Sequence, residues 1–254
     1  MPPTRLLFLV TLIIVTLLTA CGNPPPPPPA PRSEQPTTAP ANVSAPTSTT
    51  SSANATGKVK IKADVWTDNW FAFYLGEMLI KEDSVSIDTE RSFNKETFTF
   101  EAEYPLQLNF IVKDYMKNDT GLEYIGTDRQ QMGDGGFIAQ FTNAETGELI
   151  AVTGSNWKGL VIHTAPLDAN CAREANPVAG QGSCGFTSLP EPSGWKSLSF
   201  DDSAWAAATV YSTQDVSPKQ GYDEVRWEPS AQLIWGPSLK MNNIILYRFT
   251  VAKP

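Results

Sequence analysis

The sequence has few of the side chains that bind metals or form catalytic triads. It contains one histidine, His163, and three cysteines in 254 residues. A single histidine excludes a two-histidine metal site and makes most triad chemistry hard to assemble. No nucleophile with an adjacent base can be identified, so the sequence predicts no catalytic residues. It indicates no cofactor either, apart from calcium at two aspartates considered below.

Basic residues are also scarce. The chain has 19 Lys and Arg against 27 Asp and Glu, which gives a net charge of -8. Most of both kinds fall in residues 58–254, and they form no basic run. Proteins that bind nucleic acid hold phosphate with clustered Lys and Arg. The composition therefore excludes nucleic acid as a partner.

A hydrophobic run long enough to cross a membrane as a helix is absent as well. The longest apolar stretch extends from Leu6 to Leu18 after the single charge of Arg5. A spanning helix needs about 20 residues, and this stretch is shorter. A short apolar run behind a basic start is typical of an export signal. We therefore predict that residues 1–20 are a cleaved signal peptide.

The end of that signal carries a recognisable motif. The residues Leu18-Thr19-Ala20-Cys21 resemble the lipobox of bacterial lipoproteins. The resemblance implies cleavage before Cys21, diacylglycerol and palmitate-type acylation of this cysteine, and attachment to the outer side of a cell membrane or outer membrane. Two or more acyl chains give stable anchoring. The alternative is an ordinary secretory signal in which Cys21 stands by chance.

Residues 21–57 have the composition of a linker. They include six consecutive prolines from Pro24 to Pro29, and four more among Thr, Ser and Ala. Proline fixes φ and removes a hydrogen-bond donor, so this segment is predicted to be an extended or disordered spacer. The alternative is a polyproline ligand for an aromatic groove of a partner.

Residues 58–254 show the alternation of polar and apolar residues that is typical of strands. The stretches with this pattern are 58–65, 71–75, 97–102, 106–112, 137–141, 149–152, 160–163 and 244–251. Turn-forming residues separate them, and only residues 202–208 suggest a short helical turn. Many short strands without alternating helices predict an all-β domain, an antiparallel β-sandwich or jelly roll.

The two remaining cysteines, Cys171 and Cys184, lie in one loop-like segment. In an exported protein two thiols are expected to pair, and two cysteines with one histidine are too few ligands for a metal. We predict a Cys171–Cys184 disulfide.

The domain is rich in tryptophan, with seven in all. Most are expected to pack in the core. Trp66, Trp157 and Trp195 lie beside turn residues, so they are predicted to be exposed and available to stack on a sugar ring. Trp70, Trp205 and Trp235 lie beside strand-like residues and are expected inside.

A second resemblance concerns the domain. The spacing of Trp195, Phe200-Asp201-Asp202-Ser203, Trp205 and Ala208 resembles the signature of galactose-binding-like β-sandwiches, which are accessory domains of many glycosidases. Residues 68–77, 231–235 and 242–248 are similar to further strands of that family. The motifs occur here in a different chain order from many relatives. The resemblance therefore implies the fold, and it transfers no ligand site.

A few polar residues remain as candidates. Asp134, in a Gly-Asp-Gly-Gly stretch, is a candidate ligand-binding residue, and a plain hairpin turn is the alternative. Asp201 and Asp202 are the calcium candidates, although the family resemblance gives them a role in a turn. His163 is interpreted as a strand residue with one hydrogen-bonded nitrogen.

Three possible functions follow. The leading prediction is a membrane-tethered, extracytoplasmic lipoprotein with a non-catalytic binding or interaction domain, with a saccharide or another envelope component as the ligand. The alternatives are a small extracytoplasmic glycan hydrolase, which needs two facing carboxylates, and a purely structural envelope protein.

Overall fold

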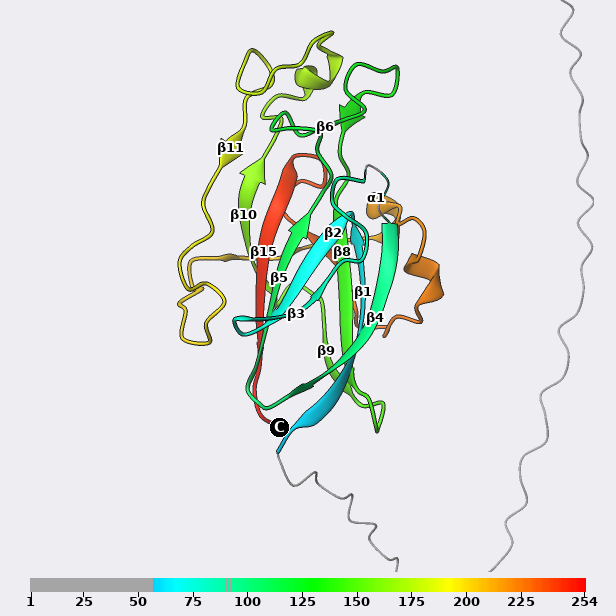
Figure 1. The fold of residues 1–254 in the computed structure, drawn as a ribbon, viewed down its shortest axis with the longest axis vertical. Helices are drawn as coiled ribbons and strands as arrows, with labels where there is room; N and C mark the ends of the chain where they lie inside the picture. The colour runs from blue at the N-terminus through cyan, green and yellow to red at the C-terminus, as the bar shows by residue number, and fades with distance from the viewer. Residues whose placement is uncertain (1–56, 90, 92) are drawn as a thin grey trace, which may run out of the picture. The chain divides into compact units, whose positions relative to one another are not determined.

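The computed structural model describes residues 57–89, 91 and 93–254. The predicted signal, Cys21 and almost all of the predicted linker lie outside these residues. All of the strands belong to one compact unit, Ser51–Pro254. Apart from one short two-stranded ribbon, they form two antiparallel sheets packed face to face (Figure 1), so the predicted antiparallel β-sandwich is confirmed.

The first sheet is built around β1 and β8. Its strand order is β13 (Thr209–Tyr211), β14 (Leu233–Trp235), β8 (Gly136–Asn143), β1 (Val59–Asp68) and β4 (Phe93–Ala102), with β9 (Leu149–Val152) also paired to β8. Every pairing is antiparallel. The strand β1 lies between β4 and β8, so both of its edges are hydrogen-bonded.

The second sheet is built around β15 and β5. Its order is β11 (Thr187–Ser188), β10 (Lys158–Thr164), β15 (Asn242–Val251), β5 (Leu106–Lys113), β2 (Trp70–Leu75) and β3 (Met78–Glu82), with β12 (Ala206–Ala207) also paired to β10. A separate ribbon pairs β6 (Leu122–Glu123) with β7 (Gln131–Met132). Each stretch that alternation predicted as a strand corresponds to a strand of the structure. These strands are β1, β2, β4, β5, β8, β9, β10 and β15.

Within residues 57–254 as described, helical structure is confined to three short turns, which are η1 (Ala169–Arg173), α1 (Thr213–Val216) and η2 (Tyr222–Glu224). The helical turn predicted at residues 202–208 is wrong beyond its first hydrogen bond, from Trp205 N to Asp202 O. The chain then extends into β12, because the edge of β10 offers backbone hydrogen-bonding groups to Ala206 and Ala207.

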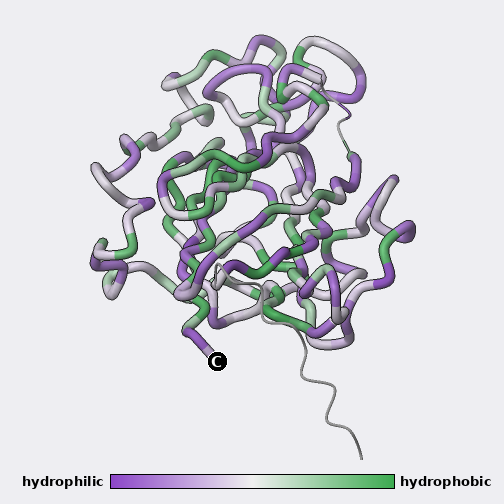
Figure 2. Tube along the Cα trace, turned by 60° about the horizontal axis from the view of Figure 1, so that its bottom comes forward, coloured by the Kyte–Doolittle hydropathy of each residue, from purple (hydrophilic) through white to green (hydrophobic). Residues whose placement is uncertain are grey.

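The hydrophobic core lies between the two sheets. In β1, Ile61, Ala63 and Val65 point inward and are fully buried. Aromatic rings from both sheets meet in the centre, where Phe110 has its ring centroid 4.8 Å from those of Phe73 and Phe137. Figure 2 shows hydrophobic residues mainly along the central strands and hydrophilic residues in the outer loops. Burial of these apolar side chains is the main stabilising contribution.

The two ends of the sandwich can be identified from the strand registers. The register of β1 and β4 pairs Val59 with Ala102 at one end and Asp68 with Phe93 at the other. The last strand, β15, finishes at the end where β1 begins, and Figure 1 shows the C-terminus there. We call the opposite end, where Asp68 and Phe93 lie, the loop end. A strand of this length separates the two ends by about 33 Å.

The predicted disulfide is confirmed. Cys171 in η1 is bonded to Cys184, with their Cα atoms 4.8 Å apart. Both cysteines are buried beside Leu122 of the small β6–β7 ribbon. The bridge therefore holds together the loops that cover the loop end, outside the two main sheets (Figure 1).

Candidate functional site

Five titratable side chains meet at the loop end. We call them the acidic cluster: Asp68 at the end of β1, Asp114 directly after β5, Glu123 in β6, Asp134 before β8, and Lys219 after α1. They come from five separate segments. The sandwich topology brings them together because β1 and β5 end, and β8 begins, at the same end of the molecule.

Lys219 is the cation of this cluster. Its Nζ lies 2.9 Å from Asp134 Oδ2 and 3.3 Å from Asp68 Oδ2. Burial raises the pKa of Asp68 well above its usual range, and the charge of Lys219 opposes that change. Burial would lower the pKa of Lys219, but Asp68 and Asp134 together raise it. Lys219 therefore stays charged and holds the two aspartates in place.

Asp114 is the most enclosed member of the cluster. Neither carboxylate oxygen has a hydrogen-bond partner among the residues described. Burial, and next the charges of Asp68 and Glu123, raise its pKa well above the ordinary value. The backbone of Gly133 packs directly on this carboxyl group, and any side chain at this position would overlap Asp114 Oδ2. The surroundings of Asp114 thus favour the neutral form of its carboxyl group over the ionised form.

The Gly-Asp-Gly-Gly stretch is not a hairpin turn. It connects β7 to β8, which belong to different sheets and do not pair. Its glycines allow close approach to side chains, since a Cβ on Gly135 would overlap the ring of Trp235. Asp134 is left partly exposed at the surface of the loop end.

A cleft of 330 Å³ opens beside the acidic cluster, and we call it the loop-end cleft. It is lined by Arg91, Phe93, Glu123, Tyr124, Arg129, Gln131, Asp134 and Lys219. Lys219 Nζ lies 4.4 Å from the ring centroid of Phe93, and the Arg129 guanidinium carbon lies 4.7 Å from that of Tyr124. Two partly exposed aromatic rings therefore stand among hydrogen-bonding side chains.

The backbone at Tyr124 is unusual. Its φ is +50°, in the left-handed region that non-glycine residues rarely adopt. Such conformations persist where the surrounding structure fixes them, and they are frequent at binding sites. Sequence reasoning missed Tyr124, Phe93 and Lys219, because they are far apart in the chain and belong to no motif. Asp134 is the one predicted ligand-binding residue that the structure places in this cleft.

The three tryptophans predicted to be exposed are buried. Trp66 and Trp157 are 0% exposed and Trp195 is 2% exposed, so the predicted exposure is wrong for each. Their indole nitrogens donate to Gln220 O, Val152 O and Glu191 Oε2, respectively. A tryptophan beside a turn can fold its ring back under the loop, where it buries more apolar surface than any other side chain. None of the three can stack on a ligand in this conformation.

The remaining tryptophan predictions are confirmed. Trp70, Trp205 and Trp235 are all buried, as their strand-like neighbours indicated. Trp205 packs against Trp195, with ring centroids 6.0 Å apart, on the outer face of the second sheet.

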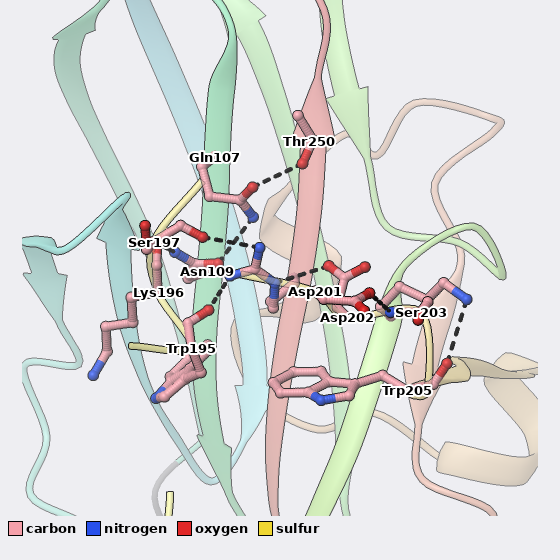
Figure 3. A network of polar contacts seen from close by, with 12 residues as sticks. Gln107, Asn109, Trp195, Lys196, Ser197, Asp201, Asp202, Ser203, Trp205 and Thr250 are labelled. Carbon is pink, nitrogen blue, oxygen red and sulfur yellow. Dashed lines mark hydrogen bonds and ion pairs between the residues drawn. The ribbon is translucent and has the colours of Figure 1, made fainter. Parts of the chain in front are cut away.

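Asp201 and Asp202 serve the loop that contains them (Figure 3). Asp201 Oδ1 accepts a hydrogen bond from Ser203 N at 3.0 Å. Asp202 Oδ2 accepts one at 2.8 Å from Nε of Arg248, which is itself buried. Asp202 is thus ion-paired with the guanidinium of Arg248. Within the described part of the chain, no three His, Cys, Asp or Glu side chains are grouped as metal ligands.

His163 lies in β10 and is buried. Its Nδ1 is 3.1 Å from Asn243 Oδ1, and its Nε2 is 3.4 Å from Asp119 Oδ1. The interpretation of His163 as a strand residue with a hydrogen-bonded ring nitrogen is confirmed.

Comparisons of the chain with protein-family models, with curated proteins and with solved structures give no match. The resemblances to lipoproteins and to galactose-binding-like domains therefore stay predictions. Among the helices formed by described residues, none has the length and hydrophobicity to span a membrane.

Proposed function

We propose that this protein is a lipid-anchored, extracytoplasmic binding protein of a bacterial envelope, and that its β-sandwich binds a saccharide in the loop-end cleft without transforming it. The observation that carries the proposal is the composition of the cleft, where Phe93 and Tyr124 stand beside Gln131, Asp134 and Lys219. Sugar rings are bound by aromatic faces together with hydrogen-bonding side chains that fix their orientation.

The direction of the chain supports this arrangement. The lipobox predicts an anchor at Cys21, and the linker leads to β1 at Val59. The loop-end cleft lies at the other end of β1, beside the partner of Asp68 in β4. A ligand would therefore bind at the end of the domain opposite to the end at which the linker joins β1.

The burial of the acids favours binding over hydrolysis. A glycosidase needs one carboxylic acid with a raised pKa that reaches the glycosidic oxygen. Asp68 and Asp114 have raised pKa values, but their side chains are enclosed by protein and cannot contact a bound glycan.

The test is a glycan array probed with the full chain, followed by titration of each bound saccharide. Tyr124→Ala should weaken binding about tenfold, because it removes one stacking ring. Leu149→Ala, an exposed apolar truncation in β9 away from the cleft, is the control and should leave the affinity unchanged. Absence of binding across the array would favour a structural protein. Release of shorter products would show a hydrolase.

A further inference from the structure

The balance of charge at the loop end is the reverse of that of the whole chain, which has 19 basic and 27 acidic residues. Two hollows open there. One is the loop-end cleft, and the other, which we call the ribbon hollow, has a volume of 450 Å³ and shares Gln131 and Asp134 with the cleft. The charged side chains that line the two hollows are five basic ones, Arg91, Arg129, Arg173, Lys219 and Lys240, and two acidic ones, Glu123 and Asp134. Hollows lined mainly by one sign of charge attract ligands of the opposite sign.

Most of these basic groups are not used by the protein itself. Lys219 pairs with Asp134 and Asp68, so its charge is compensated within the acidic cluster. The other four are exposed, and they form no ion pair and no side-chain hydrogen bond with any described residue. Their N–H donors therefore point to water and are available to a ligand.

Arg129 stands on a turn that the protein holds in place. Its guanidinium carbon lies 4.7 Å from the ring centroid of Tyr124. Thr127 closes the turn between them, because its N and Oγ1 donate to Tyr124 O at 3.1 Å and 2.7 Å. Gln130 Nε2 donates to two backbone carbonyl groups, at positions 172 and 174, within the disulfide-bonded loop 171–184. The turn is thus fixed before a ligand arrives, which lowers the cost of binding.

We infer that the saccharide bound at the loop end is acidic, a glycan that carries a carboxylate on successive sugars. Arg129 binds one carboxylate in the loop-end cleft. Arg173 and Lys240 bind the next in the ribbon hollow, and Gln131 lines both hollows where the chain of sugars passes between them. A guanidinium presents its donors in a planar fork that matches a carboxylate. This inference rests on the proposed saccharide site and names the class of its ligand.

Matched pairs of oligosaccharides test the charge of the ligand. Each pair consists of a tetramer of galacturonate, glucuronate or mannuronate and its carboxyl-reduced form, in which every carboxylate is replaced by CH₂OH. The two members have the same linkages and the same sugar rings. The full chain, in a neutral detergent, is titrated with each tetramer at low and at high salt. At least one acidic tetramer should bind about tenfold more tightly than its reduced form. Its affinity should fall as salt is added, because exposed charges are screened.

Three variants with the same exchange test the location. Arg129→Gln should weaken binding of the acidic tetramer about tenfold and leave the affinity for the reduced tetramer within about twofold, because only a charged hydrogen bond is lost. Arg173→Gln should also weaken binding of the acidic tetramer, although this residue lies outside the loop-end cleft. Arg226→Gln, at an exposed arginine that lines neither hollow, is the matched control and should change neither affinity.

The outcomes separate the acidic ligand from saccharide binding as such. Equal affinity for acidic and reduced tetramers, or an unchanged affinity for the acidic tetramer in Arg129→Gln, overturns the acidic ligand and leaves saccharide binding intact. An unchanged affinity in Arg173→Gln overturns the second charged position. Absence of binding to every tetramer and to the whole glycan array overturns the proposed function, and this inference with it.

Discussion

At the scale of single residues, Asp83 shows how burial makes stability depend on pH. It follows β3 and is buried, with Oδ1 accepting a hydrogen bond from Val85 N at 2.9 Å. Its Oδ2 has no partner within the described part of the chain. Burial raises the pKa of Asp83 from 3.8 to about 6. The folded protein therefore holds this proton more tightly than the unfolded chain does.

It follows that Asp83 lowers the free energy of unfolding as the pH rises from about 4 to above 6, because the folded state must release a proton that the unfolded state has already lost. Asp83→Asn removes this loss. We expect it to stabilise the protein by about 2 kcal/mol at pH 7 relative to its effect at pH 4. Urea unfolding at both pH values measures the difference. Asp88→Asn, at an exposed position nearby, is the control, and an equal effect of Asp83→Asn at both pH values would contradict the pKa assignment.

At the scale of elements, one arginine attaches a long loop to a strand. Arg248 in β15 donates to Asp202 Oδ2, to Trp195 O and, at 3.1 Å, to Ser197 O. These three acceptors lie in the loop between β11 and β12, and the loop carries Trp195 and Trp205 onto the outer face of the second sheet. The planar guanidinium can reach all three at once, which a lysine ammonium cannot do with the same geometry.

Arg248→Met should therefore destabilise the protein by about 3 kcal/mol or more, since it leaves a carboxylate and two carbonyl groups without their donor. The near-ultraviolet circular dichroism of the packed tryptophans should weaken in the same variant. Arg248→Lys should recover only part of the stability. Arg226→Met, at an exposed arginine, is the control, and an equally small effect of Arg248→Met and Arg226→Met would show that the loop does not depend on this contact.

The elements also show what the sequence can predict. Alternation of polar and apolar residues located the long strands and the sandwich, because alternate side chains of each strand point into the core between the sheets. The outer faces of the central strands β5 and β8 are buried as well. Alternation failed for Trp66, Trp157 and Trp195, because a side chain beside a turn has no fixed face. The loop-end cleft was missed for a different reason. Phe93, Tyr124 and Lys219 become neighbours only through the pairing of distant strands.

At the scale of the whole molecule, the covalent links lie outside the sandwich. Cys171 and Cys184 are separated by 13 positions in the chain and join loops, and neither lies in a strand. Breaking the bridge should lower the free energy of unfolding by about 3 kcal/mol, because the unfolded chain regains the conformational entropy that closing a loop of this length removes. Reduction should lower the melting temperature and leave the far-ultraviolet spectrum of the sheets intact. The Cys171→Ala/Cys184→Ala variant should be insensitive to reductant, and loss of all sheet structure on reduction would contradict the prediction.

Membrane attachment is predicted to depend on Cys21 alone. Cys21→Ser should release the protein into the soluble fraction with its domain folded, because the acyl chains provide the anchor. Detergent partitioning measures the change, and circular dichroism checks the fold. Cys171→Ala is the matched control and should leave the protein with the membrane. Unchanged partitioning of Cys21→Ser would show that another part of the protein binds the lipid.

The direction of β1 has a mechanical consequence. Under the proposed arrangement, the tether pulls at Val59 and a bound ligand pulls near Phe93, at opposite ends of the β1–β4 pair. Tension between a glycan and the membrane would then act along the strands. The hydrogen bonds that join β1 to β4 and to β8 lie across that direction, so they would be loaded together in shear and not opened one after another. The force on a bound ligand would thus be carried by β1, the strand that is hydrogen-bonded along both of its edges.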